Sequence, residues 1–364
     1  MGKRGEIDVK KQHGNQTVVF KSRPRVIGSF SIAGKKEGEG PLGSFINKIV
    51  SDDLDGEKTH EQAEQKLFES ALAGAIKDAG IKDTDVDMLF AGDLLNQIIS
   101  SSFTARGVDV SFIGVYGACS TMALSLALAA SFVDAGHVTC AACIAGSHFA
   151  TAERQYRTPL ELGNQRSPLS QWTVTGAGST IVTNTRPNTW KEAFSQRLAY
   201  DPDDCPRVAA ATFGKVVDWG VKDVNNMGAA MAPAAAATMI AHFKDIGLKP
   251  GDNVEYPYDA IFTGDLGALG EQALRDIMKD AGYHLDDTYS DCGRLIFDKN
   301  QNAYQGGSGC GCAAITLNGF IMDKLRKKDY RRVLLVATGA LLSPVSSYQG
   351  NTVPGIAHAI VLES

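Results

Sequence analysis

The sequence contains no long apolar run. Its longest apolar stretch, Met122 to Val133, is interrupted by two serines and is shorter than the roughly 20 residues of a membrane-spanning helix. The first 21 residues are polar and lack the apolar segment of a signal peptide. We therefore expect a chain without a signal peptide or transmembrane segment, which reaches a membrane only through partner proteins.

The chain also lacks an excess of positive charge. Its 36 basic and 41 acidic residues give a net charge of −5, which argues against a nucleic-acid partner held by phosphate contacts. The seven cysteines are an odd number, so they cannot all pair with one another. Several lie in apolar or glycine-rich runs, as reduced cysteines do in a reducing compartment.

What the sequence does contain is an internal repeat. Two halves show the same order of predicted elements: strand, helix, strand, helix, strand, strand. The matching strands are 25–35 and 207–215, 87–94 and 259–266, 140–146 and 333–339, and 179–183 and 358–362. Gly80 and Gly247 follow the first helix of each half, where a helix end often needs positive φ. Unbroken apolar strands alternating with helices predict an α/β fold with sheets covered on both faces.

We predict two similar βαβαββ halves related by a pseudo-two-fold axis. The N-terminal half spans residues 23–200 and the C-terminal half 201–364. The N-terminal half includes a polar, proline-containing segment, about 150–200, that shows no long helical or strand period. A loop of that length is unusual unless it has a function, so we expect it to lie over the core.

A duplicated α/β half with a cysteine at the start of a central helix resembles the thiolase superfamily, whose members have a layered α/β/α/β/α core. Several strings are more specific and resemble the stage V sporulation protein AD family. They are Gly38-Glu-Gly-Pro-Leu-Gly43, Ala91-Gly-Asp-Leu-Leu-Asn-Gln97, Gly117-Ala-Cys-Ser-Thr121, Ala150-Thr-Ala-Glu-Arg-Gln-Tyr-Arg157, Gly228-Ala-Ala-Met-Ala-Pro-Ala-Ala235, Gly306-Gly-Ser-Gly-Cys310 and Ala337-Thr-Gly-Ala-Leu-Leu-Ser-Pro344. The resemblance extends from about residue 25 to 363.

The resemblance implies a binding protein without catalytic activity. Its ligand would be dipicolinic acid (pyridine-2,6-dicarboxylate), free or as the calcium chelate, taken up into the developing spore. The protein would attach peripherally to the spore inner membrane through other membrane proteins of the same transport system. We expect no cofactor. Thiolase-fold proteins commonly dimerise through sheet edges, so a homodimer is also expected.

Cys119 is the central candidate residue. In thiolases and ketoacyl synthases the matching cysteine attacks a thioester from a helix N-terminus, which stabilises the thiolate. Those enzymes also use imidazole to activate the thiol. At the two matching turns this sequence has Asp265 and the histidine-free string Tyr304 to Gly309. Because a neighbouring carboxylate raises a thiol pKa, we predict a slowly reacting Cys119 and no catalytic residue. The alternatives are an acyltransferase that uses Cys119 and a structural subunit of a membrane assembly.

Further side chains are candidates for the ligand site. The predicted ligand-binding residues are Asp93, Asn96, Cys119, His148, Asp265, Ser308 and His358. Asp93 and Asp265 occupy equivalent positions in the repeat, where a carboxylate either caps the following turn or contacts the ligand. We expect His358 to point into the pocket and His148 to lie at its rim. The other histidines, His242 among them, are expected at the surface.

A dianionic ligand beside two aspartates needs compensation. The helix N-terminus at Cys119 and the glycine-rich N–H groups near Gly309 could receive its carboxylates. Arg154 or Arg157 could bind one of them. Alternatively, the ligand enters as its calcium chelate, and an aspartate contacts the metal.

No metal site of the protein itself is predicted. Cys140 and Cys143 should point to opposite faces of a strand. Cys310 and Cys312 have no second pair at zinc-site spacing.

Overall fold

The computed structural model describes residues 14–156, 166–185, 204–251 and 254–364. Both predicted sets of elements are present. The first half has β2 (Arg25–Ala33), α2 (His60–Ala79), β4 (Met88–Gly92), α4 (Thr121–Asp134), β6 (Cys140–Ser147) and β8 (Gly176–Thr183). The second has β9 (Arg207–Thr212), α7 (Met227–Asp245), β10 (Ala260–Thr263), α10 (Cys310–Thr316), β13 (Arg332–Ala340) and β14 (Gly355–Glu363).

The strand order confirms the duplication. The main sheet runs β11-β10-β13-β14-β9-β2-β8-β6-β4-β5. Outward from β2 the first half has β8, β6, β4 and β5, and outward from β9 the second half has the corresponding strands β14, β13, β10 and β11. Within the main sheet, β2 and β9 are joined at one paired position, Arg25 opposite Arg207. Each half also has elements that the βαβαββ pattern missed: α3 (Ile99–Arg106) and β5 (Ser111–Gly114), and α8 (Gly267–Asp280) and β11 (Tyr289–Asp291). β5 and β11 are short edge strands, and β5 is half-exposed, so neither forms the unbroken apolar run that marks a buried strand.

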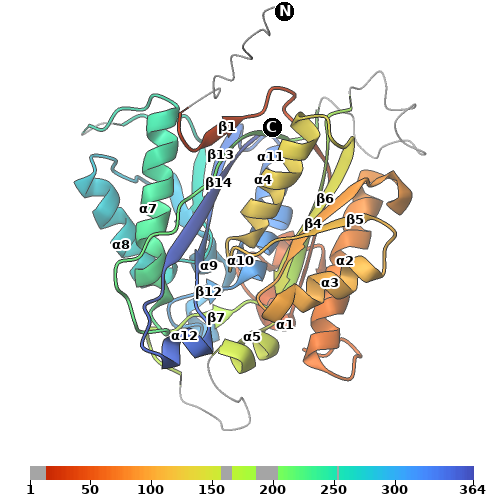
Figure 1. Ribbon diagram of the computed structural model, residues 1–364, viewed down its shortest axis with the longest axis horizontal. Coiled ribbons are helices and arrows are strands. Elements are labelled where there is room, and N and C mark those ends of the chain that lie inside the picture. The colour runs from red at the N-terminus through yellow and green to blue at the C-terminus, as the bar shows by residue number, and fades with distance from the viewer. Residues whose placement is uncertain (1–13, 157–165, 186–203, 252–253) are drawn as a thin grey trace, which may run out of the picture.

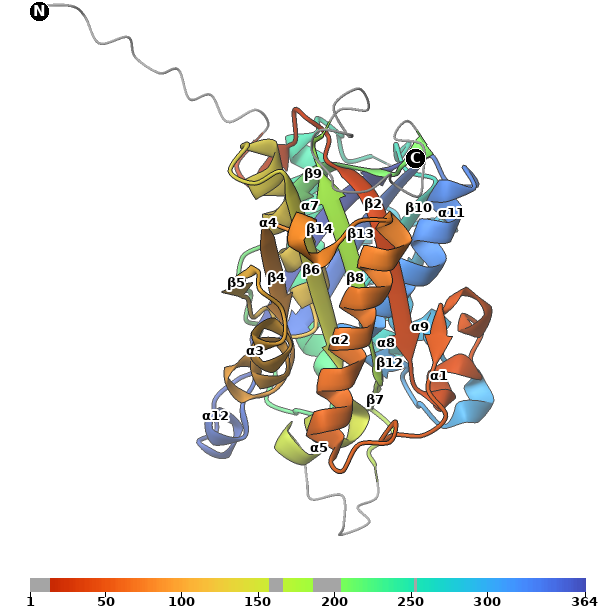
Figure 2. The ribbon, with the colours of Figure 1, turned by 90° about the vertical axis from the view of Figure 1, so that its right-hand side faces the viewer.

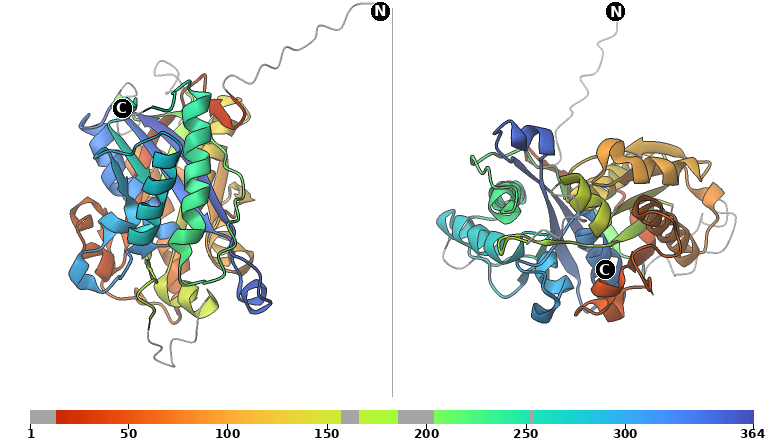
Figure 3. Two further views of the ribbon diagram at one scale, coloured as in Figure 1. Left: turned by 90° about the vertical axis from the view of Figure 1, so that its left-hand side faces the viewer. Right: turned by 90° about the horizontal axis from the view of Figure 1, so that it is seen from below.

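Helices form three layers around the sheet (Figure 1). α4 and α10 contact each other and lie between the two halves, where α4 touches strands of both. Nine residues of α4 are buried, as expected for a helix that is apolar on nearly all sides. α2 covers the outer face of the first half (Figure 2). α7 and α8 cover the second (Figure 3). The predicted α/β/α/β/α layering is therefore observed.

The C-terminal ends of α2 and α7 agree with the sequence prediction. Gly80 and Gly247 have φ of 69° and 82°, so both occupy the left-handed region that was predicted for them. Cys140 and Cys143 belong to different hydrophobic clusters on opposite faces of β6, which confirms the predicted directions of their side chains.

The segment predicted as a long loop is partly regular. Residues 149–156 form α5 (Phe149–Tyr156), and β7 (Trp172–Thr173) pairs with β12 (Gly307–Ser308). This pairing ties the segment to the glycine-rich turn of the second half, a contact that local sequence patterns do not encode. The predicted boundary at residues 200/201 falls outside the described residues.

Smaller elements complete the chain. They are β1 (Thr17–Val19), α1 (Lys35–Gly38), β3 (Lys48–Ile49), α9 (Cys292–Ile296), α11 (Met322–Arg326) and α12 (Pro344–Tyr348), four short 3₁₀ helices among the described residues at 43–45, 83–85, 96–98 and 299–301, and a π-helical turn at Leu317–Ile321.

Candidate functional site

A tight turn holds Cys119 immediately before α4. Ala118 has φ of 49°, a conformation that non-glycine residues rarely adopt. The hydroxyl of Ser120 donates to Gly117 O at 2.6 Å, and that of Thr121 donates to Ala118 O at 2.6 Å. These bonds fix the turn, so the Cys119 side chain has a defined direction.

Gly339 on β13 lets this turn approach the sheet. A Cβ at position 339 would lie 2.4 Å from Gly117 O and 3.1 Å from the Ala118 Cβ. Only glycine fits such a close backbone approach. The second half thus positions the cysteine of the first.

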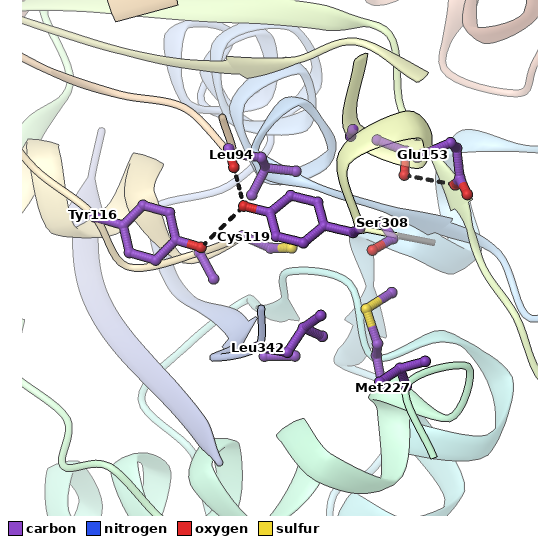
Figure 4. Close-up of a pocket in the computed structure, with 13 residues that line it drawn as sticks. Leu94, Tyr116, Cys119, Glu153, Met227, Ser308 and Leu342 are labelled. Atoms are coloured by element: carbon purple, nitrogen blue, oxygen red, sulfur yellow. Dashed lines mark hydrogen bonds between the residues drawn. The ribbon is translucent and has the colours of Figure 1, made fainter. Parts of the chain in front are cut away.

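Cys119 lies in a pocket built by both halves, with about 490 Å³ of empty space counting its mouth. Figure 4 shows Leu94 and Tyr116 on one side and Met227 and Leu342 on the other. The lining residues are Leu94, Tyr116, Ala118, Cys119, Ala152, Glu153, Tyr156, Thr173, Val224, Met227, Ser308, Ala340 and Leu342. Among the described residues, no lysine, arginine or histidine lines the pocket. Its one lining carboxylate, Glu153, accepts a hydrogen bond from the Thr173 hydroxyl at 3.1 Å.

The Asp265 carboxylate lies close to the Cys119 thiol, behind the pocket wall. Burial raises the pKa of this thiol well above its usual range, and the negative charge of Asp265 raises it further. Asp265 also accepts hydrogen bonds from the hydroxyl of Thr338 (2.7 Å) and of Ser308 (3.1 Å) and from Gly309 N (3.0 Å). Burial and the nearby carboxylate thus both favour the neutral thiol.

Two tyrosine hydroxyls form the polar part of the opposite wall. The Tyr156 hydroxyl donates a hydrogen bond to Leu94 O. The Tyr116 hydroxyl oxygen lies 3.4 Å from the Tyr156 hydroxyl oxygen. Burial raises the pKa of both hydroxyls, so both are protonated at neutral pH. Because the Tyr156 proton is directed at Leu94 O, the Tyr116 hydroxyl is the one that can donate a hydrogen bond to a ligand oxygen.

Of the seven predicted ligand-binding residues, the structure brings Cys119, Ser308 and Asp265 together. Asp93 does not line the pocket: its carboxylate accepts from Leu95 N, Ser101 N and the Ser101 hydroxyl at 2.7–2.9 Å. It therefore caps the turn that follows it. Asn96 is exposed, and its side-chain oxygen accepts from the Gln155 amide at 3.2 Å.

The backbone and arginine groups expected to bind a dianion interact with other groups of the protein instead. Gly309 N donates to Asp265, and Gly311 N donates to the Ser147 hydroxyl at 3.0 Å. Arg154 forms an ion pair with Glu61. Arg157 lies outside the described residues.

Comparison with known proteins places this geometry in a family. The sequence profile of stage V sporulation protein AD matches residues 14–363. The chain belongs to the stage V sporulation protein AD family. It is 40% identical over 350 residues to stage V sporulation protein AD of Bacillus subtilis (strain 168), an alignment that covers 96% of this chain and 97% of the relative. Family membership makes it a sporulation protein.

Solved structures with the same fold are much more distant in sequence. Xanthomonas campestris OleA with bound cerulenin has a TM-score of 0.55 and 14% identity, over 96% of this chain and 97% of that chain. The 3-oxoacyl-[acyl-carrier-protein] synthase III of Aquifex aeolicus has a TM-score of 0.54 and 12% identity, over 94% of this chain and all of that chain. These similarities establish a thiolase-like fold for this sporulation protein.

The two candidate histidines have structural partners outside the pocket. His148 Nε2 lies 2.7 Å from Asp53 O, and its Nδ1 accepts from Ala150 N at 3.2 Å, so Nε2 carries the proton. His358 Nδ1 accepts from Gly214 N at 3.3 Å. Neither lines the pocket.

The expectation that His242 lies at the surface is wrong. Its ring is buried between the Thr212 hydroxyl, 2.7 Å from Nδ1, and the Tyr258 hydroxyl, 2.5 Å from Nε2. Burial lowers its pKa from 6.5 to about 4. Its position near the end of α7 suggested exposure, but β9 and the segment before β10 cover it.

We expect His242 to make the protein acid-labile. A histidine whose folded pKa is depressed stabilises the fold fully above its unfolded pKa of 6.5, and this contribution is lost as pH falls toward 4. Between pH 7 and 5 the free energy of unfolding should fall by about 2 kcal/mol because of this residue. Urea denaturation of His242→Gln should show a correspondingly shallower pH dependence. The exposed control His137→Gln should keep the wild-type slope, and a similar slope in all three proteins would contradict the prediction.

The sequence did not indicate several pocket residues. Glu153 and Tyr156 lie in the family-specific string at 150–157, and Tyr116 directly precedes the cysteine turn. These strings were used only for the family resemblance. Met227 and Leu342 carried no signal, because a lone apolar residue gives no sign of facing a pocket.

Within the described chain, no helix is both long and apolar enough to cross a membrane.

Proposed function

We propose that this sporulation protein binds dipicolinic acid at the Cys119 pocket and catalyses no reaction. The observation that carries the proposal is the buried Asp265 carboxylate close to the Cys119 thiol, which adds to burial in raising the pKa of the thiol. An acyl-transfer enzyme needs a thiolate and donors for the thioester oxygen. Here a carboxylate occupies the place next to the sulfur and favours the neutral thiol.

The charges around the pocket favour the calcium chelate as the bound form. Glu153 on the wall and Asp265 behind it are both acidic. A bare dianion beside them would be repelled by several kcal/mol, even at an effective dielectric near ~20. The chelate is neutral overall, and its calcium has room for further oxygen ligands. Because Glu153 lines the pocket and Asp93 and Asp265 do not, we assign the contact with calcium to Glu153.

We therefore expect calcium to tighten binding of pyridine-2,6-dicarboxylate, and Glu153→Gln to remove most of that effect. Loss of one carboxylate–calcium contact should reduce the calcium-dependent gain about tenfold. Titration calorimetry with and without calcium measures both affinities. Asp93→Asn is the matched control, since this buried carboxylate does not line the pocket, and it should retain the calcium effect. Equal affinity for free and chelated ligand in wild type would refute the assignment.

The alternative of an acyltransferase is tested by mass spectrometry after incubation with acyl-CoA. A stable adduct on Cys119 would overturn the non-catalytic proposal. Equilibrium dialysis with dipicolinate separates our proposal from a purely structural subunit, which would bind no ligand.

We further propose that the protein reaches the spore inner membrane through other proteins of the transport system, and that it dimerises. The purified protein should not pellet with bare lipid vesicles, because no described helix can cross a bilayer. Tight binding to such vesicles would refute attachment through partners alone.

A further inference from the structure

The polar side chains of the Cys119 pocket differ in how far their protons are already used. Five of the lining residues carry a hydroxyl or thiol hydrogen: Tyr116, Cys119, Tyr156, Thr173 and Ser308. Each of these groups has a single hydrogen to donate. A group that already donates to a protein acceptor must give up that bond before it can donate to a ligand.

Three of the hydroxyl groups already donate within the protein. The Thr173 hydroxyl donates to the Glu153 carboxylate at 3.1 Å, and the Ser308 hydroxyl donates to the Asp265 carboxylate at 3.1 Å. The Tyr156 hydroxyl donates to a backbone carbonyl of the pocket wall. A ligand oxygen therefore gains little from these three groups, because each new bond would replace an existing one.

The Tyr116 hydroxyl is different. Its oxygen lies 3.4 Å from that of Tyr156, which is long for a hydrogen bond between two hydroxyl groups. Among the described residues this is its one polar contact. The thiol of Cys119 is a weak donor by comparison. Within the described pocket lining, Tyr116 is thus the strong side-chain donor whose proton is not held by a good acceptor.

Tyr116 also lies at the open part of the pocket. It is 46% exposed, whereas Glu153 and Ser308 are 6% and 2% exposed. Figure 4 shows Tyr116 and Glu153 on opposite sides of the pocket, with the Tyr156 ring between them. The outer part of the pocket therefore offers a hydrogen-bond donor, and the inner part offers a carboxylate.

We propose that Tyr116 selects the ligand of this pocket by donating a hydrogen bond to one carboxylate oxygen of the bound dicarboxylate. The inference rests on the proposed function, since it concerns the same pocket and the same ligand. A carboxylate has two oxygens, so one can bind calcium while the other accepts the hydrogen bond from Tyr116. The calcium then faces Glu153. The two residues thus recognise different parts of the chelate.

The test is the Tyr116→Phe variant, which removes the hydroxyl and keeps the ring on the pocket wall. We expect it to weaken binding of pyridine-2,6-dicarboxylate about tenfold in titration calorimetry. The loss should be equal with and without calcium, because this hydrogen bond does not involve the metal. Glu153→Gln differs in this respect, since it should reduce only the gain from calcium. If the Tyr116 ring acts by packing alone, the phenylalanine variant should show no loss.

Tyr256→Phe is the matched control. The Tyr256 hydroxyl donates to His284 O at 3.0 Å and lies outside the pocket, so this variant loses a similar group elsewhere and should bind as wild type does. Thermal melting confirms that each variant is folded.

The outcomes separate this inference from the function on which it rests. If the wild type binds the ligand and Tyr116→Phe binds equally well, loses no more affinity than Tyr256→Phe, or weakens only when calcium is present, the role of Tyr116 is wrong and the proposed function stands. If the wild type does not bind dipicolinate, the proposed function is wrong and the role of Tyr116 falls with it.

Discussion

Replacement of Asp265 with asparagine should accelerate alkylation of Cys119 by iodoacetamide at neutral pH about 100-fold. In the wild type the carboxylate lies close to the thiol and opposes ionisation of the sulfur. At an effective dielectric near ~20, a charge pair at this range costs several kcal/mol, and each ~1.36 kcal/mol corresponds to about one pKa unit. Because burial also raises the pKa of the thiol and persists in the variant, we expect only part of this energy to be recovered.

The rate is measured by peptide mapping, which separates Cys119 from the other six cysteines. Asp93→Asn is the control, because Asp93 has the equivalent position in the first half but bonds to Leu95 and Ser101 instead. It should leave the Cys119 rate unchanged. A wild-type Cys119 that is alkylated as fast as an active cysteine enzyme, or an Asp265→Asn variant no faster than wild type, would contradict our account of the thiol.

Replacement of Gly339 with alanine should lower the free energy of unfolding by about 3 kcal/mol. The added Cβ would lie 2.4 Å from Gly117 O and 3.2 Å from Cys119 N. Both are backbone atoms of the tight turn, which cannot rotate away as a side chain would. The turn or β13 must move, so binding of dipicolinate with calcium should weaken as well.

Urea denaturation gives the stability change, and calorimetry gives the binding change. Gly251→Ala is the control, since a Cβ there meets no atom within 4 Å and its φ is not positive. It should behave as wild type. If Gly339→Ala is as stable as Gly251→Ala, the turn is not held by the close approach of β13.

Local patterns in the sequence predicted most of the fold. Apolar runs placed β2 and β9, and the glycines at 80 and 247 marked the ends of α2 and α7, because helix termination depends on the φ of one residue. The short strands β5 and β11 and the helix α5 were missed. Their short or partly exposed segments are stabilised by neighbours that are distant in the chain.

The sequence also predicted that Cys119 would lie in a pocket and that a carboxylate would replace imidazole beside it. It named Asp265 for that position, but it also placed Asp93 among the ligand-binding residues. Asp93 and Asp265 are equivalent in the repeat, yet one turns back to Ser101 and the other meets the Cys119 thiol. The difference arises when the two halves pack together, because the partner of Asp265 comes from the other half of the chain.

The same limit applies to the remaining site residues. His148 and His358 were candidates because each lies at or near a strand end, but their ring nitrogens face Asp53 O and Gly214 N. Glu153 was not a candidate, yet it lines the pocket. There it accepts a hydrogen bond from Thr173 of β7, which lies 20 residues later in the chain. By itself, the sequence determined the repeat, the helix ends and the position of the cysteine, which depend on periodicity and backbone conformation. Only the tertiary structure decided which charges surround the cysteine, because side-chain neighbours across a packed interface depend on the relative placement of segments far apart in the chain.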